Sequence, residues 1–249
     1  MNFDYEVAVG DVFLTNGGCY CAVLEVNNKE DVIVEFLDTF KFRKKVSVYS
    51  LYSGNVKNPN RPSVWGKGFL GVGKFKVKEG GSFTIEYQVW QRMIGRCYNP
   101  KFLNKNESYR DCEVSENFLS FQNFAEWYTN HEFYGLGYEI DKDLLIRDNK
   151  LYSKDTCLLL PKRINNLFVN AKGDDRSLPV GVYKTRGSRY CSRFCVDGKN
   201  LPLGTHDTPE EASAAYVKAK EDYIHSLAEK WHGKIEERAY QALKSWTVY

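Results

Sequence analysis

Apolar and polar residues alternate in short runs along residues 7–50, and the turn-forming sequences NGG and NNKED separate these runs. A period of two places every second side chain on the same face of a β-strand, and the turn residues favour hairpins. The pattern predicts a meander of hairpins that forms a small β-barrel or sandwich. Residues 53–73 are rich in Gly, Pro and Asn, which indicates a loop-like tether and a domain boundary near residue 75.

The apolar positions change to a helical spacing in the middle of the chain, which predicts two helices with aromatic faces. Their apolar positions are Tyr87, Trp90, Ile94 and Tyr98 in the first helix, and Phe118, Phe121, Phe124 and Trp127 in the second. Two apolar runs at residues 138–145 and 156–161 then predict strands, and the spacing of apolar residues within 162–172 predicts a further helix.

Residues 181–208 read as three strands joined by turns at Gly187-Ser188 and Asp197-Gly198. A long helix follows, because Thr208 is a favourable N-cap, Pro209 fits the first turn, and two glutamates come next. The expected buried stripe of this helix consists of Ala212, Ala215, Tyr216, Ala219 and Tyr223.

Residues 230–249 predict one more helix, whose apolar face would serve for docking or for a homodimer. This face consists of Trp231, Ile235, Ala239, Ala242 and Trp246. Together these elements predict an α+β multidomain chain with an N-terminal β domain at 1–75, a central α+β domain at 76–172, and a C-terminal domain at 178–249 that ends in a helical extension.

The composition supports a folded protein, with 43% hydrophobic and 27% charged residues. The seven cysteines form no CxxC pair, so we expect free thiols. We find neither a signal peptide nor a membrane-spanning apolar segment, and we expect a cytoplasmic protein. The net charge of +3 is uninformative, but residues 161–200 hold nine Lys and Arg residues against three Asp residues.

Side chains alternate along residues 189–196, so two arginines share one face and apolar residues on the other face are free to pack against the alanine-rich helix. The first face holds Arg189, Cys191, Arg193 and Cys195, and the second holds Tyr190, Ser192, Phe194 and Val196. Lys184 and Arg186 also share a face on the neighbouring strand. A sheet with four outward cations fits the DNA major groove, whereas the alternative is a solvated cationic face without a ligand.

The run GVYKTRGSRYCSRFCVDGKNLPLGTHDTPEEASAAYVKAKEDY, residues 181–223, resembles the AP2 DNA-binding domain. The resemblance implies that a three-stranded sheet enters the major groove of double-stranded DNA while a helix packs behind it. It departs from the family pattern at Gly187-Ser188, which lacks the usual aromatic residue, and at Tyr190, where tryptophan is common. The implied DNA-binding residues are Lys184, Arg186, Arg189, Arg193 and Lys199.

The sequences VWQRMIGRCYNP, CEVSENFLSFQNFAEW and DKDLLIRDNKLYSKDTCLLLPKRINNLF resemble the central region of phage HNH-type homing endonucleases. An HNH site is a ββα unit in which histidine activates water and other ligands hold a divalent metal. No histidine lies within residues 138–168, so the site is degenerate. Candidates for an altered Mg²⁺ site are Glu139, Asp141, Asp143, Asn149 and Asn165, with Asp141 as the metal ligand. The alternative is that these residues are structural.

These resemblances imply a DNA-binding protein of a bacteriophage or mobile element, acting in the bacterial cytoplasm. The leading hypothesis is a sequence-specific transcriptional repressor derived from a homing endonuclease, which needs no cofactor to bind DNA. The alternative is an active Mg²⁺-dependent homing endonuclease or nickase, and a third hypothesis is RNA binding. The N-terminal segment, including GDVFLTN, resembles β domains of the same phage group; its lysines either touch the DNA backbone or serve solubility.

Overall fold

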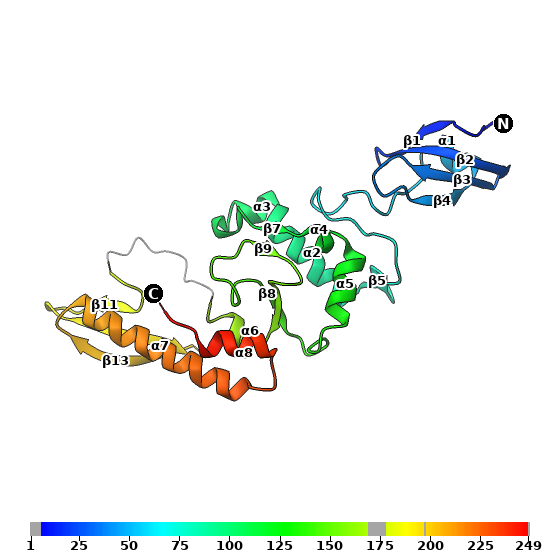
Figure 1. Ribbon diagram of the computed structural model, residues 1–249. Helices are drawn as coiled ribbons and strands as arrows, with labels where there is room; N and C mark the ends of the chain where they lie inside the picture. Colours follow the sequence, from blue (N-terminus) through cyan, green and yellow to red (C-terminus); the bar gives the residue numbers. More distant parts are fainter. Residues whose placement is uncertain (1–5, 169–177, 197, 249) are drawn as a thin grey trace. The chain divides into compact units, whose positions relative to one another are not determined.

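The protein is described by a computed structural model that covers residues 6–168, 178–196 and 198–248 (Figure 1). It is a mixed α+β chain with two compact units, Met1–Asn130 and His131–Tyr249. This division falls inside residues 76–172, and the three-domain organisation stays a prediction. No helix in the described ranges is both long enough and apolar enough to cross a bilayer.

The first unit begins with an antiparallel meander of four strands. These are β1 (Val12–Leu14), β2 (Tyr20–Asn28), β3 (Asp31–Phe36) and β4 (Arg43–Val46), followed by helix α1 (Val48–Tyr52). Every second residue of β3 is buried, as the alternating pattern predicts. Among the described strands, β1 and β4 remain the edges of an open sheet, so the expected barrel or sandwich is not formed. The reason is that α1 and Val56 cover the buried face where a second sheet would be needed.

The rest of the first unit is mostly helical. It contains β5 (Lys78–Glu79), β6 (Ser82–Phe83), α2 (Ile85–Tyr98), α3 (Pro100–Leu103), the 3-10 turn Glu107–Tyr109, β7 (Glu113–Val114), α4 (Glu116–Leu119) and α5 (Phe121–Thr129). The rings of Trp90 and Phe121 lie 5.5 Å apart between the two predicted helices. The second predicted helix is interrupted at Ser120 and forms α4 and α5. The amide of Phe69 donates a hydrogen bond to the Leu119 carbonyl, and the Ser120 side chain caps the start of α5.

The second unit follows the predicted order of strands and helices. Its elements are β8 (Glu139–Asp141), β9 (Leu151–Tyr152), β10 (Leu158–Leu160), α6 (Lys162–Asn165), β11 (Val182–Lys184), β12 (Tyr190–Val196), β13 (Lys199–His206), α7 (Pro209–Trp231) and α8 (Glu237–Lys244). Strands β8 and β10 pair antiparallel. Helix α6 is shorter than the predicted helix at 162–172, of which residues 169–172 lie outside the described residues.

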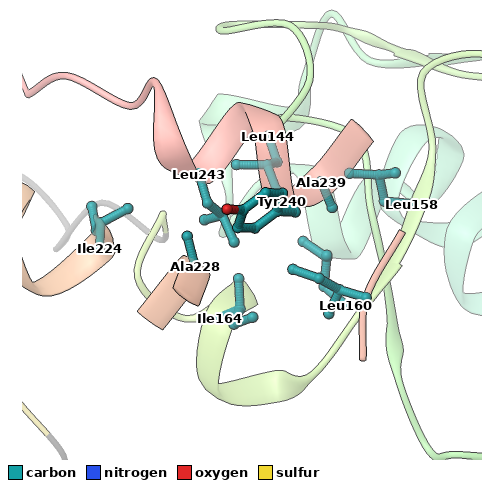
Figure 2. Close-up of a cluster of buried hydrophobic side chains, with 10 residues drawn as sticks. Leu144, Leu158, Leu160, Ile164, Ile224, Ala228, Ala239, Tyr240 and Leu243 are labelled. Carbon is teal, nitrogen blue, oxygen red and sulfur yellow. The ribbon is translucent and has the colours of Figure 1, made fainter. Parts of the chain in front are cut away.

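One buried cluster holds α6, α7, α8 and β10 together (Figure 2). It includes Ile235 and Ala239, which are 3% and 0% exposed, and Trp231 and Trp246 pack against it. These residues belong to the face predicted for docking or for a homodimer. That face therefore docks within the chain itself, with Trp231, Ala242 and Trp246 partly buried, and the homodimer stays a prediction.

Candidate nucleic-acid interface

The sheet of β11, β12 and β13 packs one face against α7 (Figure 1). Phe194 is 6% exposed, and its ring meets those of Tyr216 and Tyr223 at centroid distances of 5.9 and 5.5 Å. Ser192 is buried on the same face. The side of β12 predicted to pack against the helix is therefore confirmed. Of the predicted stripe on α7, Ala212 is buried and the remaining members are at least partly covered.

A glycine at the start of β11 permits this close packing. Gly181 has φ +79°, and a Cβ atom added there would lie 2.1 Å from the ring of Tyr216. Any other residue would combine a disfavoured backbone conformation with a steric clash. The glycine of the GVYK sequence thus sets how closely the first strand approaches α7.

The opposite face of the sheet, which we call the open face, carries an arginine held by an aromatic ring. Arg193 is exposed, and its guanidinium carbon lies 3.8 Å from the ring centroid of Tyr183. This cation–π contact reduces the number of conformations that the arginine samples. Tyr183 was not among the predicted site residues; the signal that could have identified it is its place next to the buried Val182, which turns it to the open face.

Arg189 also belongs to the open face, but it has a carboxylate neighbour. Its Nε lies 2.8 Å from Asp207 Oδ1, and its Nη2 donates to the Thr205 carbonyl at 3.1 Å. Both side chains are largely exposed, so the ion pair is weak, with a stabilisation of about 0–1 kcal/mol. Asp207, which sequence reasoning missed, orients Arg189 without removing it from solvent.

The other three predicted cations do not join this face. Lys184 pairs with Tyr190 and Lys199 pairs with Val196 in the strand register, so both belong to the side of the sheet that faces α7. Arg186 lies beyond the end of β11 in the exposed connection to β12. The four predicted cations are thus all exposed, but Lys184 and Arg186 do not share the open face with the two arginines. Val182 is buried against α7, and strict alternation then returns Lys184 to the helix side.

Asp141 is a buried carboxylate in a turn. It is 6% exposed, and its Oδ1 accepts hydrogen bonds from the amides of Asp143 and Leu144 at 3.1 and 2.8 Å. Burial raises the pKa of this carboxyl above its ordinary value. The carboxylate predicted to bind a metal therefore organises the chain at the end of β8.

Lys142 connects two further predicted site residues. The lysine is 5% exposed, and its Nζ donates to Asp143 Oδ1 at 2.5 Å and to the Asn149 carbonyl at 2.6 Å. The side chain of Asn149 donates in turn to the carbonyls of Lys142 and Leu151. These contacts close the loop between β8 and β9. The sequence did not predict that Lys142 is buried, because lysine is usually exposed and its partners here could not be identified from the sequence.

Glu139 and Asn165 form a separate pair, in which Asn165 Nδ2 donates to Glu139 Oε2 at 2.9 Å. The five candidates for an altered HNH site thus do not converge on one point. Asp141, Asp143 and Asn149 make contacts in the turn after β8, and Glu139 and Asn165 contact each other. Within the part of the chain that the structure describes, no group of three or more His, Cys, Asp or Glu residues could hold a metal ion.

A network of charged side chains at the start of α8, which the sequence did not predict, consists of His131, Glu236 and Arg238. His131 Nε2 lies 2.8 Å from Glu236 Oε1, and Arg238 Nε donates to Glu236 Oε2 at 2.7 Å. Arg238 also donates to the carbonyls of Asp155 and Cys157. Burial raises the pKa of Glu236, but the hydrogen bonds from His131 and Arg238 outweigh it and leave the pKa lowered. No sequence signal links residues this far apart.

Comparisons with known proteins do not identify a family. No family model matches the sequence, and no curated protein or solved structure matches it.

Proposed function

We propose that the protein binds a specific sequence of double-stranded DNA through the open face of the β11–β13 sheet and represses transcription by occupying that site. The observation that carries this proposal is Arg193, which stands exposed on the open face and stacks on Tyr183. The resemblance of residues 181–223 to the AP2 domain supports the same face.

The local architecture suits base recognition. The major groove is about 12 Å wide and admits β-strands, and a bidentate Arg–guanine contact contributes about 1–3 kcal/mol of discrimination. Phe194, locked between Tyr216 and Tyr223, keeps the strand that carries Arg193 in place from behind. An arginine held on a rigid strand loses less conformational entropy on binding than a freely moving one.

We prefer repression to cleavage because of the bonds that the nuclease candidates already make. Asp141 accepts two backbone amides, Asp143 bonds to Lys142, and Glu139 bonds to Asn165. A metal-dependent nuclease requires several such oxygens directed at one ion. No contact of the described residues favours that arrangement over the structural one.

Selection of bound duplexes from a genomic fragment pool tests the proposal. Titration of the selected duplex with Arg193→Ala should show about 5–150-fold weaker binding, the equivalent of roughly 1–3 kcal/mol. Lys184→Ala, a cation on the other side of the same sheet, is the matched control and should cost less than the arginine. Equal losses for the two variants, or no specific duplex at all, would refute the proposal.

Two further arms separate the alternatives. Incubation of the selected duplex with Mg²⁺ or Mn²⁺, followed by strand-resolved gel analysis, should leave both strands intact. A discrete nick or break would establish a nuclease. Competition with RNA of the same sequence should not displace the duplex, and displacement by RNA would favour the third hypothesis.

A further inference from the structure

A groove of about 720 Å³ lies in the N-terminal part of the first unit, outside the proposed DNA-binding face. Its walls come from residues 15–19, from the strand β4 region, and from the segments 54–63 and 70–73. Three side chains with positive charge line it, namely Lys44, Lys57 and Arg61, and its lining includes no carboxylate. Phe42 and Leu70 supply apolar surface beside these cations.

The strand register explains why Lys44 is directed to the groove. Lys44 pairs with the buried Val34, so it lies on the covered face of the sheet. Its neighbours Arg43 and Lys45 lie on the other face, where they form ion pairs with Glu35 and Asp31 respectively. Among the described residues, Lys44 forms no ion pair. Arg43 and Lys45 on one face of β4 are thus paired with carboxylates, whereas Lys44 on the other face is not.

The other two cations are similarly without a carboxylate partner in the described chain. Arg61 lies against the backbone of Gly17, where an added Cβ would be 3.2 Å from its Nη1. Asp38 is a carboxylate close in sequence to the groove residue Phe42, but in the described chain it forms no ion pair with these cations. It accepts hydrogen bonds from Asn58 and from the amides of Phe40 and Lys41. Three like charges around one concave surface create a positive potential that attracts an anion.

We propose that this groove binds a single strand of nucleic acid, with phosphates on the three cations and a base against Phe42. A volume of this size is typical of small-molecule pockets, about 300–1,000 Å³, and holds one or two nucleotides. In a double helix the bases are paired and stacked, so none would be free to lie against Phe42, whereas the unstacked bases of a single strand are. Cations alongside an aromatic side chain are the combination that binds single strands without sequence preference. This inference is independent of the proposed duplex-binding face.

The test measures the binding of the full chain to a fluorescent oligothymidylate of about 12 nucleotides as a function of salt. Each phosphate contact contributes about −0.7 to the slope of log K against log[salt]. The double variant Lys44→Gln/Lys57→Gln should reduce the slope by about 1.4 and weaken binding about 25-fold at 0.1 M salt. The matched control is Lys101→Gln/Lys105→Gln, which removes two exposed charges of the same unit outside the groove.

Equal effects of the two double variants, or no effect of either, would overturn the inference. Thermal melting checks that each variant is folded, and Arg61→Gln provides a second test should the double variant melt early.

Free thymidine monophosphate at millimolar concentration should compete only weakly. Full competition by the mononucleotide would mean that the groove takes a nucleotide and not a strand. Specific duplex binding should persist in the groove variants, so failure here and failure of the duplex proposal are distinguishable.

Discussion

The β11–β13 sheet and the β8–β10 hairpin both carry charged residues on short strands, but they use them in opposite ways. In the sheet, Arg189 and Arg193 stand in solvent while Phe194 packs behind them. In the hairpin, Asp141 and Lys142 are 6% and 5% exposed and bond to neighbouring chain atoms. The same kind of sequence signal therefore becomes a surface in one region and a scaffold in the other.

The difference arises from what surrounds each strand. In β12, the buried residues Ser192 and Phe194 lie on one side only, so Arg193 on the other side remains hydrated. Strand β10 is buried along its whole length, so polar groups next to it lose water and must satisfy one another. A charged residue is thus a better site candidate on a strand with one covered face than next to a strand covered on both.

The largest expected effect concerns the packing behind the open face. Phe194→Ala should lower the free energy of unfolding by about 3–5 kcal/mol, because it leaves a cavity between the sheet and α7. Leu201, which pairs with Phe194 in β13 and is 47% exposed, provides the control, since Leu201→Ala should cost much less. Urea denaturation measures both. Equal losses would contradict the difference in burial between Phe194 and its cross-strand partner on the same side of the sheet.

The next effect tests whether the hairpin is a scaffold. Lys142→Ala should destabilise the protein by about 2–3 kcal/mol, below the range for a fully buried pair because Asp143 is partly exposed. Lys154→Ala, at an exposed position nearby, should be nearly neutral. Affinity for the selected duplex should stay unchanged in the folded Lys142 variant. A loss of affinity without a loss of stability would place Lys142 in a functional site.

A smaller effect concerns the orientation of Arg193. Tyr183→Ala should weaken specific duplex binding by about 0.5–1 kcal/mol, because the guanidinium loses its aromatic support. Tyr183→Phe keeps the ring and should bind like the parent protein. Binding titrations at one salt concentration suffice for the comparison. A Phe variant as weak as the Ala variant would show that the hydroxyl group, and not the ring, matters.

The smallest expected effect is the pH dependence of stability, which should differ in sign between the carboxyls of Glu236 and Asp141. Glu236 has a lowered pKa when folded, so it contributes stability above its unfolded pKa, near 4.5, which is lost as pH falls through the folded value. Asp141 has a raised pKa, so its contribution has the opposite sign and stability falls as pH rises from about 4. Glu236→Gln should therefore destabilise the protein at neutral pH, and the difference from the parent should shrink in acid.

Urea titrations of the parent and of Glu236→Gln between pH 3 and pH 7 make this measurement. Asp141→Asn serves as the comparison, since its effect should change in the other direction with pH. A constant difference between parent and Glu236→Gln at all pH values would show that the His131–Glu236–Arg238 network does not depend on charge.

The sequence alone predicted the features that depend on near neighbours. Alternation identified the two sides of β12, and Thr208 with Glu211 forms the capping box at the start of α7, where a helix start was expected. Aromatic spacing identified α2 and the region of α4 and α5. These features depend on contacts within a few residues, so their signal is present in any short window of the chain.

Only the tertiary structure decided which side of each element finds a partner. It turned Lys184 away from the open face, buried Lys142, and paired His131 with Glu236 across 105 positions. It also covered the N-terminal sheet with α1 and, among the described strands, left β1 and β4 as its edges. Burial and ion pairing between distant segments depend on how the whole chain packs, and local periodicity carries no information about which segments meet.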